Sequence, residues 1–250
     1  MPDIDPSLQA LVEDVDLLCL DAGNTVVFFD HARLARACES EGFAPTAPLL
    51  VIAEGKAKIA LDEGRLQHWT WSESESPSAR GWGKFVGTML VLAGLRSERV
   101  PGRLDALWSQ HRARNFWSLV PEGLPAALDR ARALGVRVAI VSNSEGMLER
   151  LLDEVGVLGS VDLVVDSGLA GVEKPDPRIF EIALQRFGAP PSRALHLGDT
   201  FGTDVVGARA AGVRVALVDP FGQLAGYHAD VPRVPGAVEV AREIARTRGG

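Results

Sequence analysis

The chain has 250 residues, of which 46% are hydrophobic and 24% charged, as is usual for a soluble protein with a buried core. A net charge of −7 argues against nucleic acid as a partner, and no apolar stretch reaches the roughly 18 residues that a membrane span needs. The acidic N-terminus lacks an export signal, and Cys19 and Cys38 offer neither metal-ligand spacing nor a disulfide framework, so we expect a cytoplasmic protein without a membrane partner.

Five short apolar runs predict buried parallel strands. Each run is rich in Val, Ile or Leu and shows no polar alternation, as expected when both faces of a strand are covered. The runs are residues 15–20, 137–141, 161–165, 194–197 and 213–218.

Helical patterns lie between these runs, with apolar residues repeated at helical spacing. They cover residues 123–134, 147–155, 177–187 and 204–211. A glycine follows each pattern, and glycine adopts the left-handed conformation that often ends a helix. These glycines are Gly135, Gly156, Gly188 and Gly212. Alternating strands and helices predict an α/β domain with a parallel sheet covered on both faces.

Residues 32–117 interrupt this alternation with four helical stretches and no strand run. The stretches are residues 32–40, 48–62, 79–95 and 103–117. All five tryptophans lie in this insert, where they predict the core of a small helical bundle. The insert carries a charge of +3 and the remaining chain −10, which favours a lid over an anionic substrate.

Chemistry-bearing residues follow the predicted strands, where ligands bind in open parallel sheets. Asp21-Ala22-Gly23-Asn24-Thr25 follows the first run, and Ser142-Asn143-Ser144 follows the second. Lys174-Pro175 precedes the helical pattern at 177–187, and Asp199 and Asp204 follow the fourth run as Gly-Asp-x-x-x-x-Asp. Three carboxylates, a hydroxyl and a lysine are therefore expected at one edge of the sheet.

In this order the four segments resemble the motifs of the haloacid dehalogenase superfamily of phosphatases and related hydrolases. The resemblance implies a Rossmann-like, doubly wound parallel sheet as the core, at residues 1–31 and 118–250. It also implies that residues 32–117 form a helical cap of the C1 type. The expected substrate is a small, phosphorylated molecule, and a homodimer is one candidate assembly.

The family's roles transfer to the matching residues. Asp21 would be the nucleophile that forms a covalent aspartyl intermediate. Asp21, Asp199, Asp204 and the backbone carbonyl of Gly23 would hold Mg²⁺. Ser142 and Asn143 would bind the transferring phosphoryl group, Lys174 would neutralise its charge, and Thr25 would brace the first loop.

Gly23 departs from the family's pattern, because phosphatases of this superfamily carry a second aspartate there as acid and base. Its absence leaves other reactions open, namely C–P or C–halogen cleavage, and also a ligand-binding paralogue without turnover. Lys56 or Lys58 in the insert could serve as a Schiff-base lysine, although exposed lysines are the favoured interpretation. His31 could replace the missing acid, and His196 is expected to be a core residue.

Overall fold

The computed structural model describes residues 6–40, 42–144 and 146–249. It divides into two compact units. The first comprises Met1–Phe28, Leu119–Pro220 and Gly226–Gly250, and the second comprises Phe29–Ser118 and Phe221–Ala225. The second unit therefore combines a long insert with a five-residue segment from about 100 residues further along the chain, and this segment is not part of the predicted insert.

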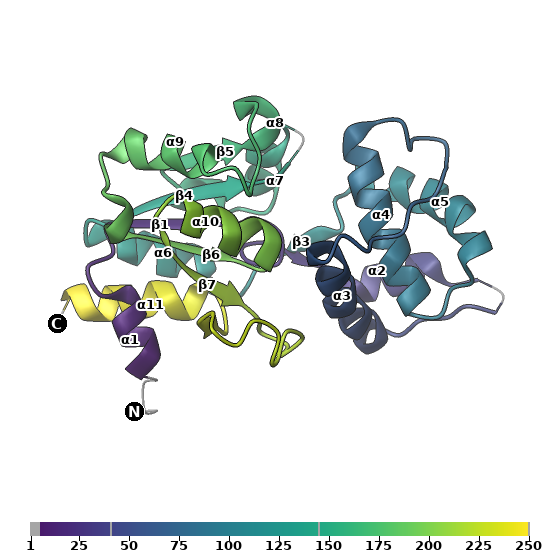
Figure 1. Ribbon diagram of the computed structural model, residues 1–250, viewed down its shortest axis with the longest axis horizontal. Coiled ribbons are helices and arrows are strands. Elements are labelled where there is room, and N and C mark those ends of the chain that lie inside the picture. Colours follow the sequence, from purple (N-terminus) through teal and green to yellow (C-terminus); the bar gives the residue numbers. More distant parts are fainter. Residues whose placement is uncertain (1–5, 41, 145, 250) are drawn as a thin grey trace. The chain divides into compact units, whose positions relative to one another are not determined.

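A six-stranded sheet forms the centre of the first unit, in the order β5-β4-β1-β6-β7-β8 (Figure 1). All neighbouring strands are parallel. The strands are β1 (Leu17–Leu20), β4 (Arg137–Ser142), β5 (Leu163–Asp166), β6 (Ala194–Gly198), β7 (Arg214–Val218) and β8 (Arg233–Val234). The five predicted strands and the parallel sheet are confirmed, whereas the two-residue β8 is not predicted.

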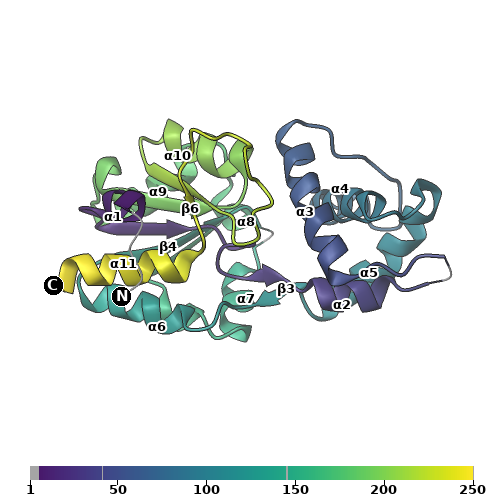
Figure 2. The same cartoon turned by 90° about the horizontal axis from the view of Figure 1, so that it is seen from below.

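Helices cover both faces of this sheet, as Figure 2 shows. Helices α6 (Leu124–Ala133) and α11 (Ala237–Gly249) lie on one face, and α9 (Arg178–Phe187) and α10 (Val206–Ala210) lie on the other. The unit also contains α1 (Pro6–Val12), α7 (Leu148–Glu154), α8 (Ser167–Ala170) and 3-10 turns at Leu158–Ser160 and Pro191–Arg193. All four predicted terminating glycines have a positive φ, between 61° and 89°. Helices α1, α8 and α11 are not predicted.

The segment predicted as one helix over 204–211 has a different form. Phe201–Val205 is a π-helix, in which the amide of Val206 donates to the carbonyl of Phe201, and α10 follows it. A π-turn is wider than an α-turn and is frequent at functional sites. The wider turn begins two residues after Asp199 and carries Asp204.

The second unit is a helical bundle of α2 (His31–Cys38), α3 (Ala47–Asp62), α4 (Pro77–Leu92) and α5 (Val100–Ala113), with a 3-10 turn at Ser97–Arg99. Trp71 and Trp82 belong to its buried core, and the other three tryptophans pack against that core. The predicted bundle core is therefore confirmed. The short strands β2 (Phe28–Phe29) and β3 (Trp117–Leu119) pair where the chain passes between the units, and neither is predicted.

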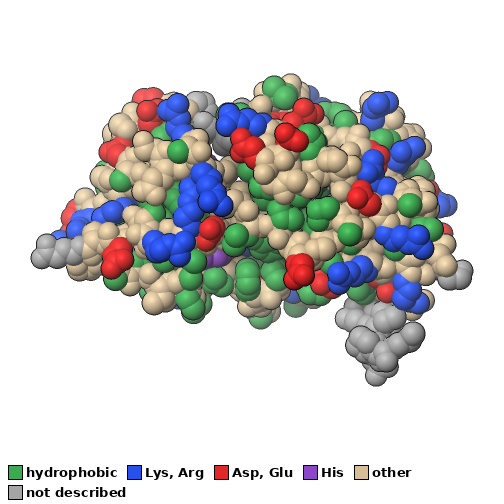
Figure 3. All heavy atoms as spheres, turned by 180° about the vertical axis from the view of Figure 1, so that it is seen from behind, with side chains coloured by type: hydrophobic (Ala, Val, Ile, Leu, Met, Phe, Trp, Pro, Cys, Tyr) green, Lys and Arg blue, Asp and Glu red, His purple; other side chains and the backbone are tan. Residues whose placement is uncertain are grey.

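Charged side chains of both signs are mixed on the face shown in Figure 3, where acidic groups lie among the basic ones. Within the described ranges, no helix has both the length and the apolar character needed to cross a bilayer.

Candidate active site

Three of the predicted site residues lie at the carboxyl edge of the sheet. Asp21 follows β1, which lies between β4 and β6. Ser142 is the last residue of β4, and Asp199 directly follows β6. All three are buried. Parallel strands bring their carboxyl ends to one edge, so these three residues lie along the same edge although they are far apart in sequence.

The loop after β1 is closed by backbone hydrogen bonds and linked to the loop after β6. The carbonyl of Ala22 accepts from the amides of Val26 and Val27, at 3.0 and 2.9 Å. Asn24 has a φ of 52°, which asparagine tolerates better than most residues. Its Nδ2 donates to Oδ2 of Asp199 at 3.1 Å. Asn24 therefore joins two site loops, a role that the sequence analysis missed.

Two other residues of this loop were singled out in the sequence. Gly23 forms an isolated parallel bridge with Val27. Thr25 is fully buried, and its Oγ1 has no hydrogen-bond partner among the described residues. Any bracing by Thr25 therefore comes from its packing and from its amide, which donates to the carbonyl of Ala22 at 3.4 Å.

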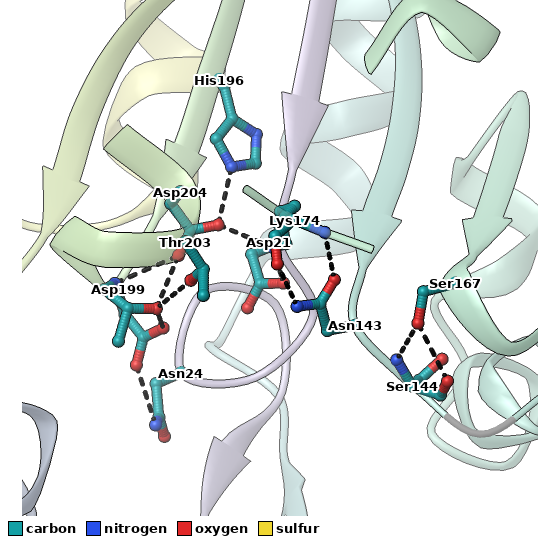
Figure 4. Close-up of polar contacts among 11 residues, drawn as sticks. Asp21, Asn24, Asn143, Ser144, Ser167, Lys174, His196, Asp199, Thr203 and Asp204 are labelled. Atoms are coloured by element: carbon teal, nitrogen blue, oxygen red, sulfur yellow. Dashed lines mark hydrogen bonds and ion pairs between the residues drawn. The ribbon is translucent and has the colours of Figure 1, made fainter. Parts of the chain in front are cut away.

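Lys174 lies between two carboxylates at the centre of the site (Figure 4). Its Nζ lies 2.5 Å from Oδ1 of Asp21 and 2.6 Å from Oδ1 of Asp204. Asn143 fixes the backbone of Lys174, because its Oδ1 accepts from the amide at 2.7 Å and its Nδ2 donates to the carbonyl at 2.9 Å. The side chain of Asn143 thus orients the lysine, a contact that the sequence motif alone does not specify. The Lys174–Pro175 peptide bond is cis.

Asp204 accepts four hydrogen bonds, two on each oxygen. Its Oδ1 accepts from Lys174 and from Nε2 of His196, the latter at 2.9 Å. Its Oδ2 accepts from the amide and the hydroxyl of Thr200, at 3.1 and 2.8 Å. A carboxylate has about four lone-pair positions, so the hydrogen-bonding capacity of Asp204 is filled by protein groups. His196 and Thr200 are the contacts that sequence reasoning missed here.

The buried cluster holds more negative than positive charge, because three carboxylates surround one lysine. Burial raises the pKa of Asp21 to about 7, with Asp204 and Asp199 acting in the same direction and Lys174 opposing them. Burial also disfavours the charged form of Lys174, but Asp204 and Asp21 outweigh it and raise the pKa of Lys174 above its ordinary value. Lys174 is therefore a cation, and the raised pKa of Asp21 reflects its burial first and the neighbouring carboxylates second.

The residues of this cluster fit a divalent metal ion. One carboxylate oxygen from each of Asp21, Asp199 and Asp204 lies within 4.8 Å of the other two. Oxygen ligands suit Mg²⁺, and a charge of +2 would offset the two negative charges that Lys174 leaves unpaired. Among the described residues, Lys174 is the only side chain hydrogen-bonded to the Asp21 carboxylate, and it uses Oδ1 alone. The other oxygen of Asp21 is thus available to an ion or a substrate.

A second set of polar contacts orders the loop after β4. Asp166, at the end of β5, accepts from the amides of Gly146 and Leu148 through Oδ1 and Oδ2, at 2.9 and 3.1 Å. The hydroxyl of Ser167 donates to the carbonyl of Ser144 and accepts from its amide. These contacts anchor the chain that follows Ser142 and Asn143, and Figure 4 shows those between Ser144 and Ser167.

The alternative acid and Schiff-base candidates belong to the second unit. His31 is buried, with Nε2 3.0 Å from Oε2 of Glu54. Lys56 is exposed as expected, but Lys58 is only 5% exposed, so the prediction of an exposed lysine is wrong for Lys58. Its Nζ lies 3.4 Å from Oε1 of Gln223. This contact depends on the segment 221–225, which joins the second unit from far along the chain.

Comparison with known proteins gives consistent matches to one family. Residues 15–212 match the haloacid dehalogenase-like hydrolases. A phosphoserine phosphatase from Thermus thermophilus is 42% identical over 223 residues, which cover 86% of this chain and 82% of that protein. The Bos taurus haloacid dehalogenase-like hydrolase domain-containing protein 3 is 35% identical over 142 residues, and the chain spans only 56% of that relative's length.

A solved structure extends the likeness to both units. A hydrolase from Bacillus subtilis, described as bound to magnesium, superposes with a TM-score of 0.62 over 92% of this chain and 98% of that one. The two sequences are 16% identical, so this likeness concerns the fold.

Proposed function

The chain belongs to the haloacid dehalogenase-like hydrolases, and we propose that it is a magnesium-dependent phosphatase that acts on small phosphorylated metabolites through a covalent intermediate on Asp21. One observation carries this proposal. Asp21 is buried at the centre of the sheet edge, with the ammonium group of Lys174 2.5 Å from its Oδ1 and two further aspartates nearby. A nucleophilic carboxylate, a fixed cation and a metal-binding pair are the parts that phosphoryl transfer requires.

The proposed reaction has two displacement steps. A carboxylate oxygen of Asp21 attacks the phosphorus, the bond to the leaving alkoxide breaks, and an acyl phosphate forms on Asp21. Water then attacks the same phosphorus, the bond between phosphorus and Asp21 breaks, and inorganic phosphate leaves the restored carboxylate. The proton that the water loses passes through solvent to the alkoxide released in the first step. Lys174 contacts the nucleophile throughout and offsets the charge on the phosphoryl oxygens. The hydroxyl of Ser142 and the backbone amide of Asn143 donate to those oxygens in this proposal.

Magnesium, when bound, supplies positive charge that lets a phosphate dianion approach the carboxylates and that stabilises the transition state. Asp21 and Asp199 would hold it, with the carbonyl of Gly23 as a third protein ligand. Asp204 supports the site indirectly, because protein donors already fill both of its oxygens. Its main role is then to hold Lys174 in place.

Gly23 has no side chain that could protonate the leaving group or activate the water. General acid–base catalysis typically contributes about 10²–10⁴ in rate. The proposed enzyme therefore depends strongly on the quality of the leaving group. Acyl phosphates, aryl phosphates and other esters with acidic leaving groups should be better substrates than simple alkyl phosphates.

A Schiff-base reaction at Lys58 is less well supported than phosphate hydrolysis. Such a reaction requires a neutral amine, which burial alone would favour. For Glu54, one helical turn before Lys58, burial raises the pKa, but the charge of Lys58 and the hydrogen bond from His31 outweigh burial and lower it. A buried carboxylate one helical turn from Lys58 is therefore unfavourable for the neutral amine that a Schiff base requires.

Phosphate release from a panel of phosphate esters, measured with and without magnesium, tests the proposal. The panel should include aryl phosphates, sugar phosphates and O-phosphoserine, the last because of the Thermus relative's name. We expect magnesium-dependent release by the wild type. Asp21→Asn should abolish it, since an amide is a poor nucleophile.

Asp153→Asn provides a matched control, because it makes the same chemical change at an exposed position of α7. It should release phosphate as the wild type does. Equal release by the wild type and Asp21→Asn, or none from any ester, would contradict the proposal. Borohydride trapping with phosphonoacetaldehyde, followed by mass spectrometry at Lys58, tests the Schiff-base reaction separately.

A further inference from the structure

His196 is a fully buried histidine in the middle of β6. In the sheet it lies beside Cys19 of β1 and Val215 of β7. Its ring meets Phe180 of α9 edge-on, with 4.9 Å between the ring centroids. The site on the sheet is thus apolar, and packing alone would be served by a leucine or a phenylalanine.

The ring is hydrogen-bonded to Asp204. Nε2 lies 2.9 Å from Oδ1 of Asp204, the same oxygen that accepts from Nζ of Lys174 at 2.6 Å. A carboxylate oxygen can only accept a hydrogen bond, so Nε2 carries a proton and donates it to Oδ1 of Asp204.

This hydrogen bond helps to fix the orientation of the Asp204 carboxylate next to the ammonium group of Lys174. With Thr200 on Oδ2 and His196 on Oδ1, the carboxylate is held in a single orientation. Lys174 can then contact Asp204 and still reach Oδ1 of Asp21 at 2.5 Å. Without His196, the buried Oδ1 of Asp204 would lose one of its two donors and keep only Lys174, and a lost hydrogen bond is costly in a low-dielectric site. Asp204 would compensate by turning and drawing Lys174 away from Asp21.

We propose that His196 is a positioning residue, which fixes Asp204 through an Nε2–H donor and thereby holds Lys174 against the nucleophile. The effect of His196 on turnover rests on the proposed phosphatase function. The tautomer of the ring and its hydrogen bond to Asp204 do not depend on that function, so they can be tested separately.

Two amide variants and one apolar variant of His196 separate the effect of the hydrogen bond on kcat from the effects of polarity and size. The amide nitrogen of His196→Gln reaches about as far from the backbone as Nε2 does, whereas that of His196→Asn reaches only as far as Nδ1. His196→Leu fills the apolar space and donates nothing. We expect kcat to fall about 10- to 100-fold for Asn and Leu, as is typical when a residue supporting a site ligand is removed. The Gln variant should retain most of the wild-type kcat, and KM should change little in all three.

Thermal unfolding of the variants separates positioning from a purely structural role. The Gln and Asn variants should unfold at similar temperatures while their kcat values differ. Equal kcat values for the Gln and Asn variants, or wild-type kcat in the Leu variant, would overturn the proposal.

The protonation of the ring is measured by ¹⁵N NMR of the wild type, with His196→Gln used to identify the signal. We expect a proton on Nε2. A proton on Nδ1 alone would overturn the proposal whatever the enzyme's activity. Absence of phosphate release by the wild type, combined with the expected tautomer, would instead contradict the proposed function and leave the hydrogen bond to Asp204 intact.

Discussion

Gly198 lies directly against the carboxylate of Asp204, and a Cβ atom on Gly198 would be 2.1 Å from Cγ of Asp204. Glycine at the end of β6 therefore leaves the space that the Asp204 carboxylate occupies. Because four hydrogen bonds hold that carboxylate, it cannot move aside without losing contacts to Lys174, His196 or Thr200. The site therefore requires a residue without a side chain at position 198.

Gly198→Ala should displace Asp204 and, with it, Lys174. A misplacement of about 1 Å can reduce turnover about 100-fold, and we expect a loss of that order in kcat. Overpacking should also lower the free energy of unfolding by about 1–3 kcal/mol. Gly159→Ala is the control, because nothing lies within 4 Å of its new methyl group. Equal kcat values for the two variants would show that Asp204 is not held as described.

Acid should destabilise the protein through His111 of α5. Burial lowers the pKa of His111 from 6.5 to about 4, and Arg33 acts in the same direction. As the pH falls below 6.5, the unfolded chain takes up a proton at His111 while the folded state does not. The stability contribution of the neutral ring is therefore complete above about pH 6.5 and is lost progressively down to about pH 4.

His111→Asn tests this dependence, because an amide oxygen can still accept from the amide of Phe116, as Nδ1 does at 3.3 Å, yet does not titrate. Thermal midpoints of the wild type and the variant should be measured from pH 7.5 to 4.5. We expect the wild type to lose more stability than the variant between pH 6.5 and 4.5. Parallel plots of thermal midpoint against pH for the two proteins would contradict a buried, neutral His111.

Gly55 of α3 should resist substitution by alanine, although alanine usually stabilises a helix. A Cβ atom on Gly55 would lie 2.7 Å from Cβ of Gln223. Gln223 is held close to α3 because its Nε2 donates to the carbonyl of Val51 at 2.5 Å. We expect Gly55→Ala to lower the free energy of unfolding by about 1–3 kcal/mol, the usual cost of overpacking.

Gly81→Ala is the matched control for this prediction. Gly81 is exposed in α4 with nothing within 4 Å of its new methyl group, so it should gain about 0.5–1 kcal/mol from the higher helix propensity of alanine. Urea unfolding should show a lower free energy of unfolding for Gly55→Ala and a higher one for Gly81→Ala. A stabilised Gly55→Ala would mean that Gln223 leaves α3 without cost.

The α/β fold could be predicted because each of the five longer strands is a continuous apolar run, and glycines mark the helix ends. Strands β2 and β8 have only two residues each, too few to show any pattern. Helix α11 is amphipathic, with Val240, Ala241 and Ile244 on its buried side, and its signal was present in the sequence but overlooked. The π-helix before α10 depends on hydrogen bonds that periodicity does not encode.

Asp21 and Asp199 could be predicted from their positions after strands, whereas Lys174 and Asp204 could be predicted from motifs that resemble those of the haloacid dehalogenase superfamily. Their supporting contacts could not, because hydrogen-bond partners are selected by tertiary structure. His196 was correctly expected in the core, but its contact with Asp204 depends on how the chain turns after Gly198. The burial of Lys58 depends on Gln223, which is 165 residues away.

Gly23→Asp should change how the proposed phosphatase responds to its leaving group. Without an acid at position 23, kcat/KM of the wild type should fall steeply as the pKa of the leaving alcohol rises. A carboxyl group there can protonate the departing oxygen, and general acid catalysis typically contributes about 10²–10⁴. The variant should therefore hydrolyse alkyl phosphates at least about 10-fold faster, with little change for p-nitrophenyl phosphate, whose leaving group needs no proton.

Gly23→Asn is the control for that substitution, because it adds nearly the same volume without an ionisable proton. A plot of log kcat/KM against leaving-group pKa should be shallower for Gly23→Asp than for the wild type and unchanged in slope for Gly23→Asn. Equal slopes for all three proteins would mean that another group already supplies the proton. Loss of activity in both variants would mean that the site needs the open backbone at Gly23, and the missing acid would then reflect a different reaction from phosphomonoester hydrolysis.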